Sequence, residues 1–164
     1  MLKKTFIHIP GIGEKTEQQM WESGIIDWEN ISSNPLALPP ARFKTIKDWI
    51  DISKQHLETN NHQFFSDLLP AAQQWRLFPE FSDNCAYIDI ETTGLDMARS
   101  VITTIALYDG KDIKTFVNGR NLMSFPEEIK KYGMIITYNG KTFDVPFIES
   151  YFNIRMDHAH IDLR

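Results

Sequence analysis

Residues 86–95 read AYIDIETTGL, a run of strand-forming residues interrupted at alternate positions by Asp89 and Glu91. Successive side chains of a strand point to opposite faces, so these two carboxylates share one face. They lie about 6–7 Å apart along the strand and repel each other by about 2–3 kcal/mol at an effective dielectric constant near 20. Two explanations follow: an edge strand with one solvated face, or a divalent cation that neutralises the pair.

The chain from residue 85 onward alternates strand-forming and helix-forming segments. Asp109-Gly110 is a strong hairpin signal, and Ser124 and Glu127 have the spacing of a helix capping box. The order β-β-β-α-β-α-β predicts an α/β fold with a mixed sheet. In that sheet the first three strands are antiparallel neighbours, and the later strands are joined by helical crossovers. We expect strands at 86–91, 101–108, 112–117, 134–138 and 159–163, and helices at 124–133 and 143–153.

Residues 1–80 have sequence patterns typical of helices and not of strands. Helical patterns cover residues 14–23 and 41–58, and a linker between them contains Pro35, Pro39 and Pro40. Gly24 follows the first pattern as a helix C-cap. We therefore expect two domains: a helical N-terminal extension at 1–80 and the sheet-containing domain at 84–164.

A glycine loop, IPGIGEKTEQQM at residues 9–20, opens the N-terminal extension. Its pattern is similar to half of a helix-hairpin-helix element, in which backbone N–H groups bind a phosphate. Glu14 and Glu17 would repel a phosphate, and the upstream helix of such a hairpin is missing. The alternative, a tight turn that docks the N-terminal segment, stays open.

Asp144 supplies a third carboxylate in TYNGKTFDVPFI, residues 137–148. A strand that has a hairpin partner on one side and a crossover strand on the other is central, so 86–91 should lie next to 134–138. Asp144 then falls at the start of the following helix, near the carboxyl end of the first strand, where α/β sheets bind ligands. The simpler explanations are a helix-capping Asp144 and an Asn139 that only serves the turn.

These residues resemble a known family. IDIETTGL is similar to the first motif, and YNGKTFD to the second, of the ribonuclease H-like 3′–5′ exonuclease (DEDD) superfamily. With HIPGIGEKTEQQMWESGI and WRLFPEF added, the chain resembles most closely the bacterial YprB-type predicted exonucleases. The resemblance implies a five-stranded ribonuclease H-like sheet and metal-dependent hydrolysis of phosphodiester bonds.

The resemblance also implies a set of site residues and a cofactor. Asp89, Glu91 and Asp144 would be the catalytic metal ligands for two Mg²⁺ or Mn²⁺ ions, which suit an all-oxygen site. The partner would be the 3′ end of a nucleic acid, with DNA and RNA equally open. Residues expected to meet that 3′ end are Thr92, Thr93, Gly94, Leu95 and Asn139.

The sequence departs from the family pattern at its third motif. That motif pairs a Tyr or His with an Asp four residues later on a last helix, whereas this sequence stops at Arg164. His158 and Asp162 have the same spacing but fall on the preceding strand, so Asp162 is at most an accessory carboxylate. We therefore expect a C-terminally truncated domain with weakened metal binding and little nuclease activity, unless a partner supplies the missing helix.

Composition narrows the alternatives. The net charge of −5 argues against coating nucleic acid by bulk electrostatics, and a single cysteine excludes a disulfide framework. The sequence contains no apolar run long enough to span a membrane and no secretion signal, so we expect a cytoplasmic protein. The second hypothesis is a catalytically impaired nucleic-acid-binding or scaffolding module. Such a module would be completed by a partner or by homo-oligomerisation through an exposed sheet surface.

Overall fold

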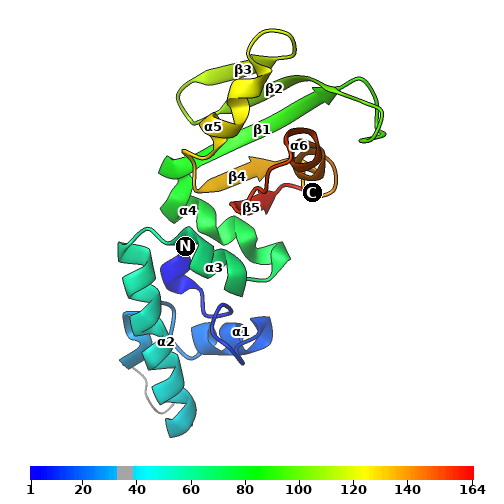
Figure 1. Cartoon of the computed structure of the whole chain (residues 1–164). Coiled ribbons are helices and arrows are strands. Elements are labelled where there is room, and N and C mark those ends of the chain that lie inside the picture. Colours follow the sequence, from blue (N-terminus) through cyan, green and yellow to red (C-terminus); the bar gives the residue numbers. More distant parts are fainter. Residues whose placement is uncertain (33–38) are drawn as a thin grey trace. The chain divides into compact units, whose positions relative to one another are not determined.

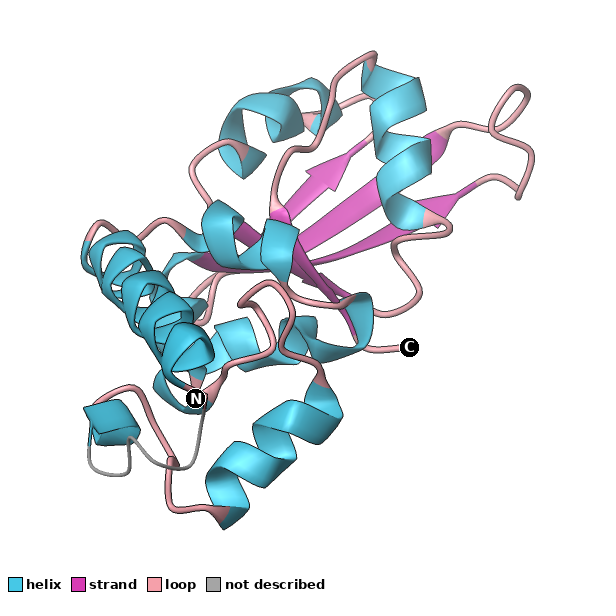
Figure 2. Ribbon diagram, turned by 90° about the horizontal axis from the view of Figure 1, so that it is seen from below, coloured by secondary structure: helices cyan, strands magenta, loops and turns pink. Residues whose placement is uncertain are grey.

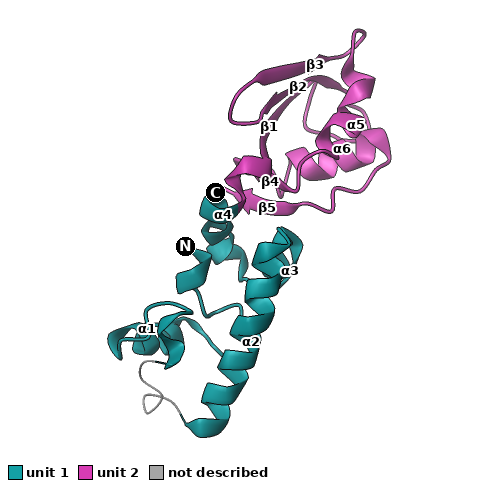
Figure 3. Ribbon diagram, turned by 90° about the vertical axis from the view of Figure 1, so that its left-hand side faces the viewer, with its two compact units in different colours: residues 1–80 teal, residues 81–164 magenta. Residues whose placement is uncertain are grey.

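The computed structural model describes residues 1–32 and 39–164, which form two compact units, 1–80 and 81–164 (Figure 3). Pro35, one of the prolines expected in a linker, lies outside the described residues, and Pro40 begins a long helix. Among the described residues, no helix has the length and apolar character needed to cross a membrane.

Unit 1 is helical (Figure 1). Its first long helix ends where the sequence predicts, because Gly24 adopts a left-handed φ of 88° and the N–H of Ile25 bonds to the Met20 carbonyl at 2.9 Å. The segments are the 3-10 turns η1 (Leu2–Lys4), η2 (Asn30–Ser32) and η4 (Ala71–Leu77), and the helices α1 (Glu14–Glu22), α2 (Pro40–Glu58), α3 (His62–Leu68) and, at the unit boundary, α4 (Phe78–Phe81).

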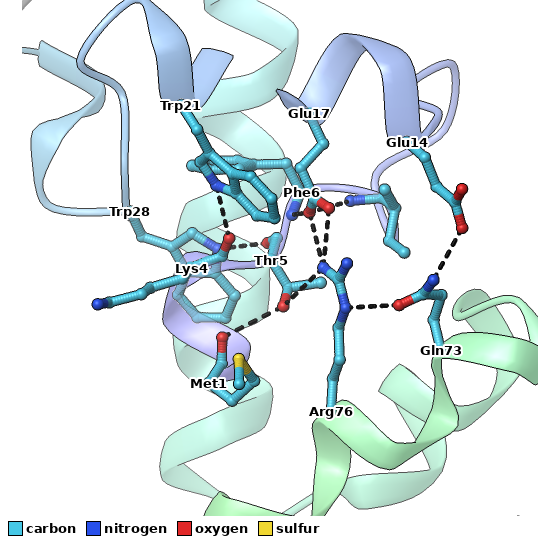
Figure 4. Close-up of polar contacts among 11 residues, drawn as sticks. Met1, Lys4, Thr5, Phe6, Glu14, Glu17, Trp21, Trp28, Gln73 and Arg76 are labelled. Atoms are coloured by element: carbon cyan, nitrogen blue, oxygen red, sulfur yellow. Dashed lines mark hydrogen bonds and ion pairs between the residues drawn. The ribbon is translucent and has the colours of Figure 1, made fainter. Parts of the chain in front are cut away.

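Glu17 of α1 is the centre of a buried ionic network in unit 1 (Figure 4). Its side chain is 1% exposed and lies 2.8 Å from Nη1 of Arg76. The same carboxylate accepts the backbone N–H groups of Phe6 at 2.6 Å and Ile7 at 3.3 Å. Arg76 also donates to the Thr5 hydroxyl at 3.3 Å. One carboxylate therefore ties the N-terminal segment, α1 and η4 together.

The glycine loop that precedes α1 is a tight turn. Gly11 has a φ of 81°, and Gly13 is the N-cap residue of α1. Glu17, which follows the glycine loop in the sequence, binds Arg76 and the Phe6 and Ile7 amides. Its presence next to this loop therefore has a structural explanation. A helix-hairpin-helix role for this loop stays a prediction.

Glu17→Gln should destabilise the protein by about 3–5 kcal/mol, because it leaves the Arg76 guanidinium buried without its counter-charge. Urea denaturation followed by circular dichroism measures the change. Glu14→Gln is the matched control: Glu14 is exposed on the same helix and bonds to Gln73 at 2.8 Å, so its loss should cost less than about 1 kcal/mol. Equal losses in the two variants would contradict this account of the network.

Unit 2 contains a mixed five-stranded sheet, whose strands are magenta in Figure 2, in the order β3-β2-β1-β4-β5 (Figure 1). The first three strands are antiparallel neighbours, and the last two run parallel to β1, as the sequence predicts. The elements are β1 (Cys85–Thr92), β2 (Ile102–Tyr108), β3 (Ile113–Val117), β4 (Met134–Thr137) and β5 (Ala159–Asp162), the 3-10 turns η5 (Ser82–Asn84) and η6 (Leu122–Ser124), and the helices α5 (Phe125–Ile129) and α6 (Asp144–Phe152).

One face of this sheet forms the core of unit 2. Ala86, Ile88 and Ile90 of β1 are buried, and α5 and α6 cover that face with Phe125 and Phe147. Burying one such large side chain contributes about 1.5–3 kcal/mol. By strand alternation Asp89 and Glu91 point to the opposite face, and both are exposed. Because β1 is the middle strand of the sheet, an edge position does not explain its two carboxylates.

The predicted capping box at Ser124 and Glu127 is wrong. The turn η6 already gives Ser124 a helical backbone, with φ −88° and ψ −11°, whereas a capping residue needs an extended one. The Ser124 hydroxyl instead donates to the Asn121 carbonyl at 2.7 Å. The helix covers only Phe125–Ile129, shorter than expected.

The outer edge of β3 is covered by the side chain of Asn121. Its Oδ1 accepts the N–H of Val117 at 2.8 Å, and its Nδ2 donates to the carbonyl of Thr115 at 2.9 Å. These are a donor and an acceptor that a neighbouring strand would otherwise bind.

Candidate active site

The site is located where β1 extends beyond β4. The two strands pair only from Cys85 with Met134 to Tyr87 with Ile136. Beyond that point the β4-facing edge of β1 needs another partner. Asp144, the first residue of α6 and only 4% exposed, provides it, because its Oδ1 accepts the N–H of Ile90 at 3.2 Å. The Asp144 carboxyl is therefore held at the backbone between Asp89 and Glu91.

Asp144 does not cap its own helix. The N-cap residue of α6 is Phe143, and no side chain makes a cap hydrogen bond there. Pro146 falls in the first turn, where its missing N–H costs nothing. The simpler interpretation of Asp144 as a helix cap is therefore wrong, and its side chain is used to contact β1.

The electrostatics of Asp144 favour a cation. Burial raises the pKa of its carboxyl, and the charges of Asp89 and Asp162 raise it further, against the opposing effects of the backbone N–H groups of Asp144 itself and of Ile90. Within residues 1–32 and 39–164, no ion pair involves Asp89, Glu91 or Asp144. The negative charge at this end of β1 is therefore uncompensated by Lys, Arg or His side chains of the described chain.

The loop between β4 and α6 is tightly constrained. Asn139 has a left-handed φ of 63°, and a Cβ added to Gly140 would lie 2.4 Å from the Thr137 side chain. The Oδ1 of Asn139 accepts the Thr142 hydroxyl at 2.8 Å and Nη1 of Arg164 at 2.9 Å. The Asn139 side chain thus serves the turn, and a role in orienting substrate stays a prediction.

The four residues expected to meet substrate on the β1–β2 loop differ in their availability. The Thr92 hydroxyl donates to the Gly94 carbonyl at 2.8 Å, and the Thr93 hydroxyl accepts the N–H of Val101 at 3.0 Å. These hydroxyls close the loop. Leu95 is 82% exposed and is open to a ligand.

Asp162 and His158 are not brought together. Both oxygens of Asp162 accept backbone N–H groups of the β4–α6 loop, whereas Nε2 of His158 lies 3.2 Å from the Ile129 carbonyl at the end of α5. The H-x-x-x-D spacing therefore has no common site here.

The described part of the chain contains no group of three or more His, Cys, Asp or Glu side chains close enough to hold a metal ion. The structure places Asp144 at the β1 backbone between Asp89 and Glu91, whose side chains are both exposed. The ligand role of these three carboxylates stays a prediction, although their oxygen chemistry fits a hard divalent cation.

Two residues next to the β4–α6 loop, Thr137 and His160, were not predicted from the sequence. Oγ1 of Thr137 lies 2.7 Å from Nε2 of His160, and burial lowers the pKa of His160 to about 4. The signal was available in strand alternation, which places His160 and Asp162 on the same face of β5.

Gly140→Ala should destabilise the protein by about 1–3 kcal/mol, because the new Cβ overlaps the Thr137 side chain. Thermal unfolding measures the change. Gly13→Ala is the control: Gly13 has a φ of −101° and nothing within 4 Å of its added Cβ, so only the difference between Gly and Ala as an N-cap, less than about 1 kcal/mol, should be lost. A Gly140→Ala variant as stable as the wild type would contradict the tight packing of this loop.

Asp144→Asn should stabilise the metal-free protein at neutral pH. A carboxyl whose folded-state pKa is raised opposes folding once it is ionised, so its cost is present above the folded-state pKa and disappears below the unfolded-state pKa. The gain from Asn should therefore shrink as the pH falls through the acidic range. Chemical denaturation across a pH series with a chelator present checks this, and a loss of stability at pH 7 would contradict it.

Comparison with known proteins found a family match within unit 2. Residues 86–164 match the sequence model of the RNase_H superfamily. Part of the chain is similar to the family B DNA polymerase from the hyperthermophilic archaeon Pyrobaculum calidifontis, with 23% identity, a TM-score of 0.36 and coverage of 42% of this chain and 11% of that one. No curated protein matched the chain.

Two structures of NrnC from Brucella melitensis, one of them with bound Mg²⁺, are also similar. Each is 19% identical over 47% of this chain and 40% of that chain, with TM-scores of 0.35 and 0.34. This chain spans less than half the length of each of these solved structures. Residues 86–164 thus match the RNase_H superfamily, and the mixed five-stranded sheet of unit 2 is consistent with a ribonuclease H-like fold.

Proposed function

We propose that unit 2 is a divalent-metal-dependent nuclease domain that hydrolyses phosphodiester bonds of DNA or RNA from a 3′ end. The observation that carries this proposal is the buried Asp144 carboxyl bonded to the Ile90 N–H, between two exposed carboxylates of β1. The match of residues 86–164 to the RNase_H superfamily supports the nuclease class. The motifs IDIETTGL and YNGKTFD support the finer assignment to DEDD exonucleases of the YprB type.

Asp89, Glu91 and Asp144 are the residues that would hold Mg²⁺ or Mn²⁺. All three offer carboxylate oxygens, which these hard cations prefer. Two ions bound there would supply an activated water and stabilise the leaving 3′-oxygen. The protein contributes an Asp144 fixed by the Ile90 N–H and two β1 side chains that are exposed and so have rotamer freedom.

The substrate would be oriented from two loops. The end of β1 and the loop that follows carry Thr92, Thr93, Gly94 and the exposed Leu95, and the β4–α6 loop carries Asn139. Both loops adjoin strand ends at which ligands of α/β folds bind. A nucleotide at the 3′ end would meet the backbone of the first loop and the side chain of Leu95.

A second candidate function is a nucleic-acid-binding or scaffolding module without catalysis. The specific observation in its favour is that the described residues contain no gathered group of three metal-ligating side chains. Such a module would bind nucleic acid without using Mg²⁺ or Mn²⁺ for chemistry.

Mn²⁺ calorimetry and hydrolysis of 3′-labelled single-stranded DNA and RNA separate these functions. The nuclease proposal predicts that the wild type binds Mn²⁺, weakly for a site with three carboxylates, and that its shortening of a substrate is slow and requires Mg²⁺ or Mn²⁺. Asp89→Asn should lower metal affinity and activity by more than about a hundredfold, because even residues that only support a ligand typically cost 10–100-fold.

Asp112→Asn is the matched control, since Asp112 is exposed on the β2–β3 loop. It should bind and cleave as the wild type does. Nucleic-acid binding without Mn²⁺ binding or cleavage would favour the second candidate. Cleavage that persists in Asp89→Asn would contradict the proposed site.

A further inference from the structure

We propose that Asp162 is a positioning residue: it clamps the β4–α6 loop and thereby fixes Asp144, without itself binding metal. The inference rests on the proposed function in one respect, namely that Asp144 holds a cation. It replaces the expectation that Asp162 is an accessory ligand with a distinct role on β5.

Among the described residues, the hydrogen bonds of Asp162 come from backbone N–H groups. Its Oδ1 accepts the N–H groups of Asn139 at 2.7 Å and Arg164 at 3.2 Å, and its Oδ2 accepts that of Lys141 at 2.9 Å. A carboxylate oxygen has two in-plane lone pairs, so Oδ1 is fully used and Oδ2 is half used. Burial raises the pKa of Asp162, but these N–H groups outweigh it and lower the pKa overall.

A second clamp holds the same loop from β5. His160, two residues earlier on the same face of the strand, pairs with Thr137 Oγ1 at 2.7 Å. That hydroxyl in turn accepts the N–H of Gly140 at 3.2 Å. Asp162 of β5 therefore binds the loop at Asn139 and Lys141, and Thr137 of β4, paired with His160 of β5, binds it at Gly140.

Because the loop is held by these hydrogen bonds, the position of Asp144 is restricted as well. The carbonyl of Gly140 accepts the N–H of Val145 at 2.9 Å, so the first turn of α6 is fixed to the clamped loop. The side chain of Asn139 also accepts the Thr142 hydroxyl at 2.8 Å. Asp144 stands between Thr142 and Val145, and its bond to Ile90 is made from a helix start that the clamps hold in place.

The experiment compares Asp162→Asn and Asp162→Glu with the wild type. Asn has nearly the same size but loses the charge and one acceptor oxygen. Glu keeps the charge but displaces both oxygens by one methylene. Two quantities are measured: the Mn²⁺ affinity by calorimetry, and the hydrogen-exchange rate of the Ile90 amide by NMR in the metal-free protein. The Ile90 amide reports directly on the position of Asp144.

Both variants should weaken Mn²⁺ binding by about 10–100-fold, as loss of a residue that supports a metal ligand typically does. The Ile90 amide should exchange at least about tenfold faster in both, because its acceptor is released. Asp157→Asn is the control, because Asp157 is exposed, lies five residues earlier and pairs with the exposed Arg155. It should leave both quantities unchanged.

Three outcomes would overturn the proposal. Unchanged Ile90 exchange in both variants would mean that the clamp does not reach Asp144. Wild-type affinity and exchange in Asp162→Glu would mean that only the charge matters. Loss of all Mn²⁺ binding in Asp162→Asn with unchanged Ile90 exchange would identify Asp162 as a ligand. A wild type that binds no Mn²⁺ would contradict the proposed function instead, and the Ile90 amide alone would then decide the positioning role.

Discussion

The candidate site depends on a difference in strand length. β1 has eight residues, of which only Cys85 to Tyr87 pair with the parallel β4, so more than half of the central strand lacks that neighbour. A buried N–H without an acceptor costs about 1–3 kcal/mol, and Asp144 removes that cost at Ile90. Folding of the sheet and placement of the carboxylate are therefore one requirement. In this chain the group that accepts the Ile90 N–H also brings negative charge to the end of β1.

Much of this arrangement could be predicted from the sequence, because it follows from periodicity. Strand alternation placed Asp89 and Glu91 on one face, and the strand–helix order placed Asp144 next to β1. The capping box predicted at Ser124 was wrong because a serine caps a helix only when its own backbone is extended. The preceding 3-10 turn gives Ser124 a helical backbone instead. The contacts of Asp162 could not be foreseen, because they depend on which way the N–H groups of a loop turn.

The two units treat buried carboxylates in opposite ways. In unit 1, Glu17 is neutralised by Arg76 and two backbone amides, which makes it part of the scaffold. In unit 2, Asp144 has other carboxylates as its charged neighbours, and no described side chain forms an ion pair with it. A fold retains such a cost most readily where an external cation relieves it, so uncompensated burial indicates a functional site better than burial alone.

The Asn121 side chain at β3 also bears on how this protein meets others. Sheets associate most readily by adding a strand at an open edge, which supplies a ladder of backbone hydrogen bonds without needing a matching surface. At β3 one amide group already occupies the N–H of Val117 and the carbonyl of Thr115. An incoming strand would have to displace Asn121 before gaining its first bonds there. The Asn121 side chain thereby hinders the addition of a further strand at the β3 edge. At other sheet edges a proline, a bulge or a row of lysines has the same effect.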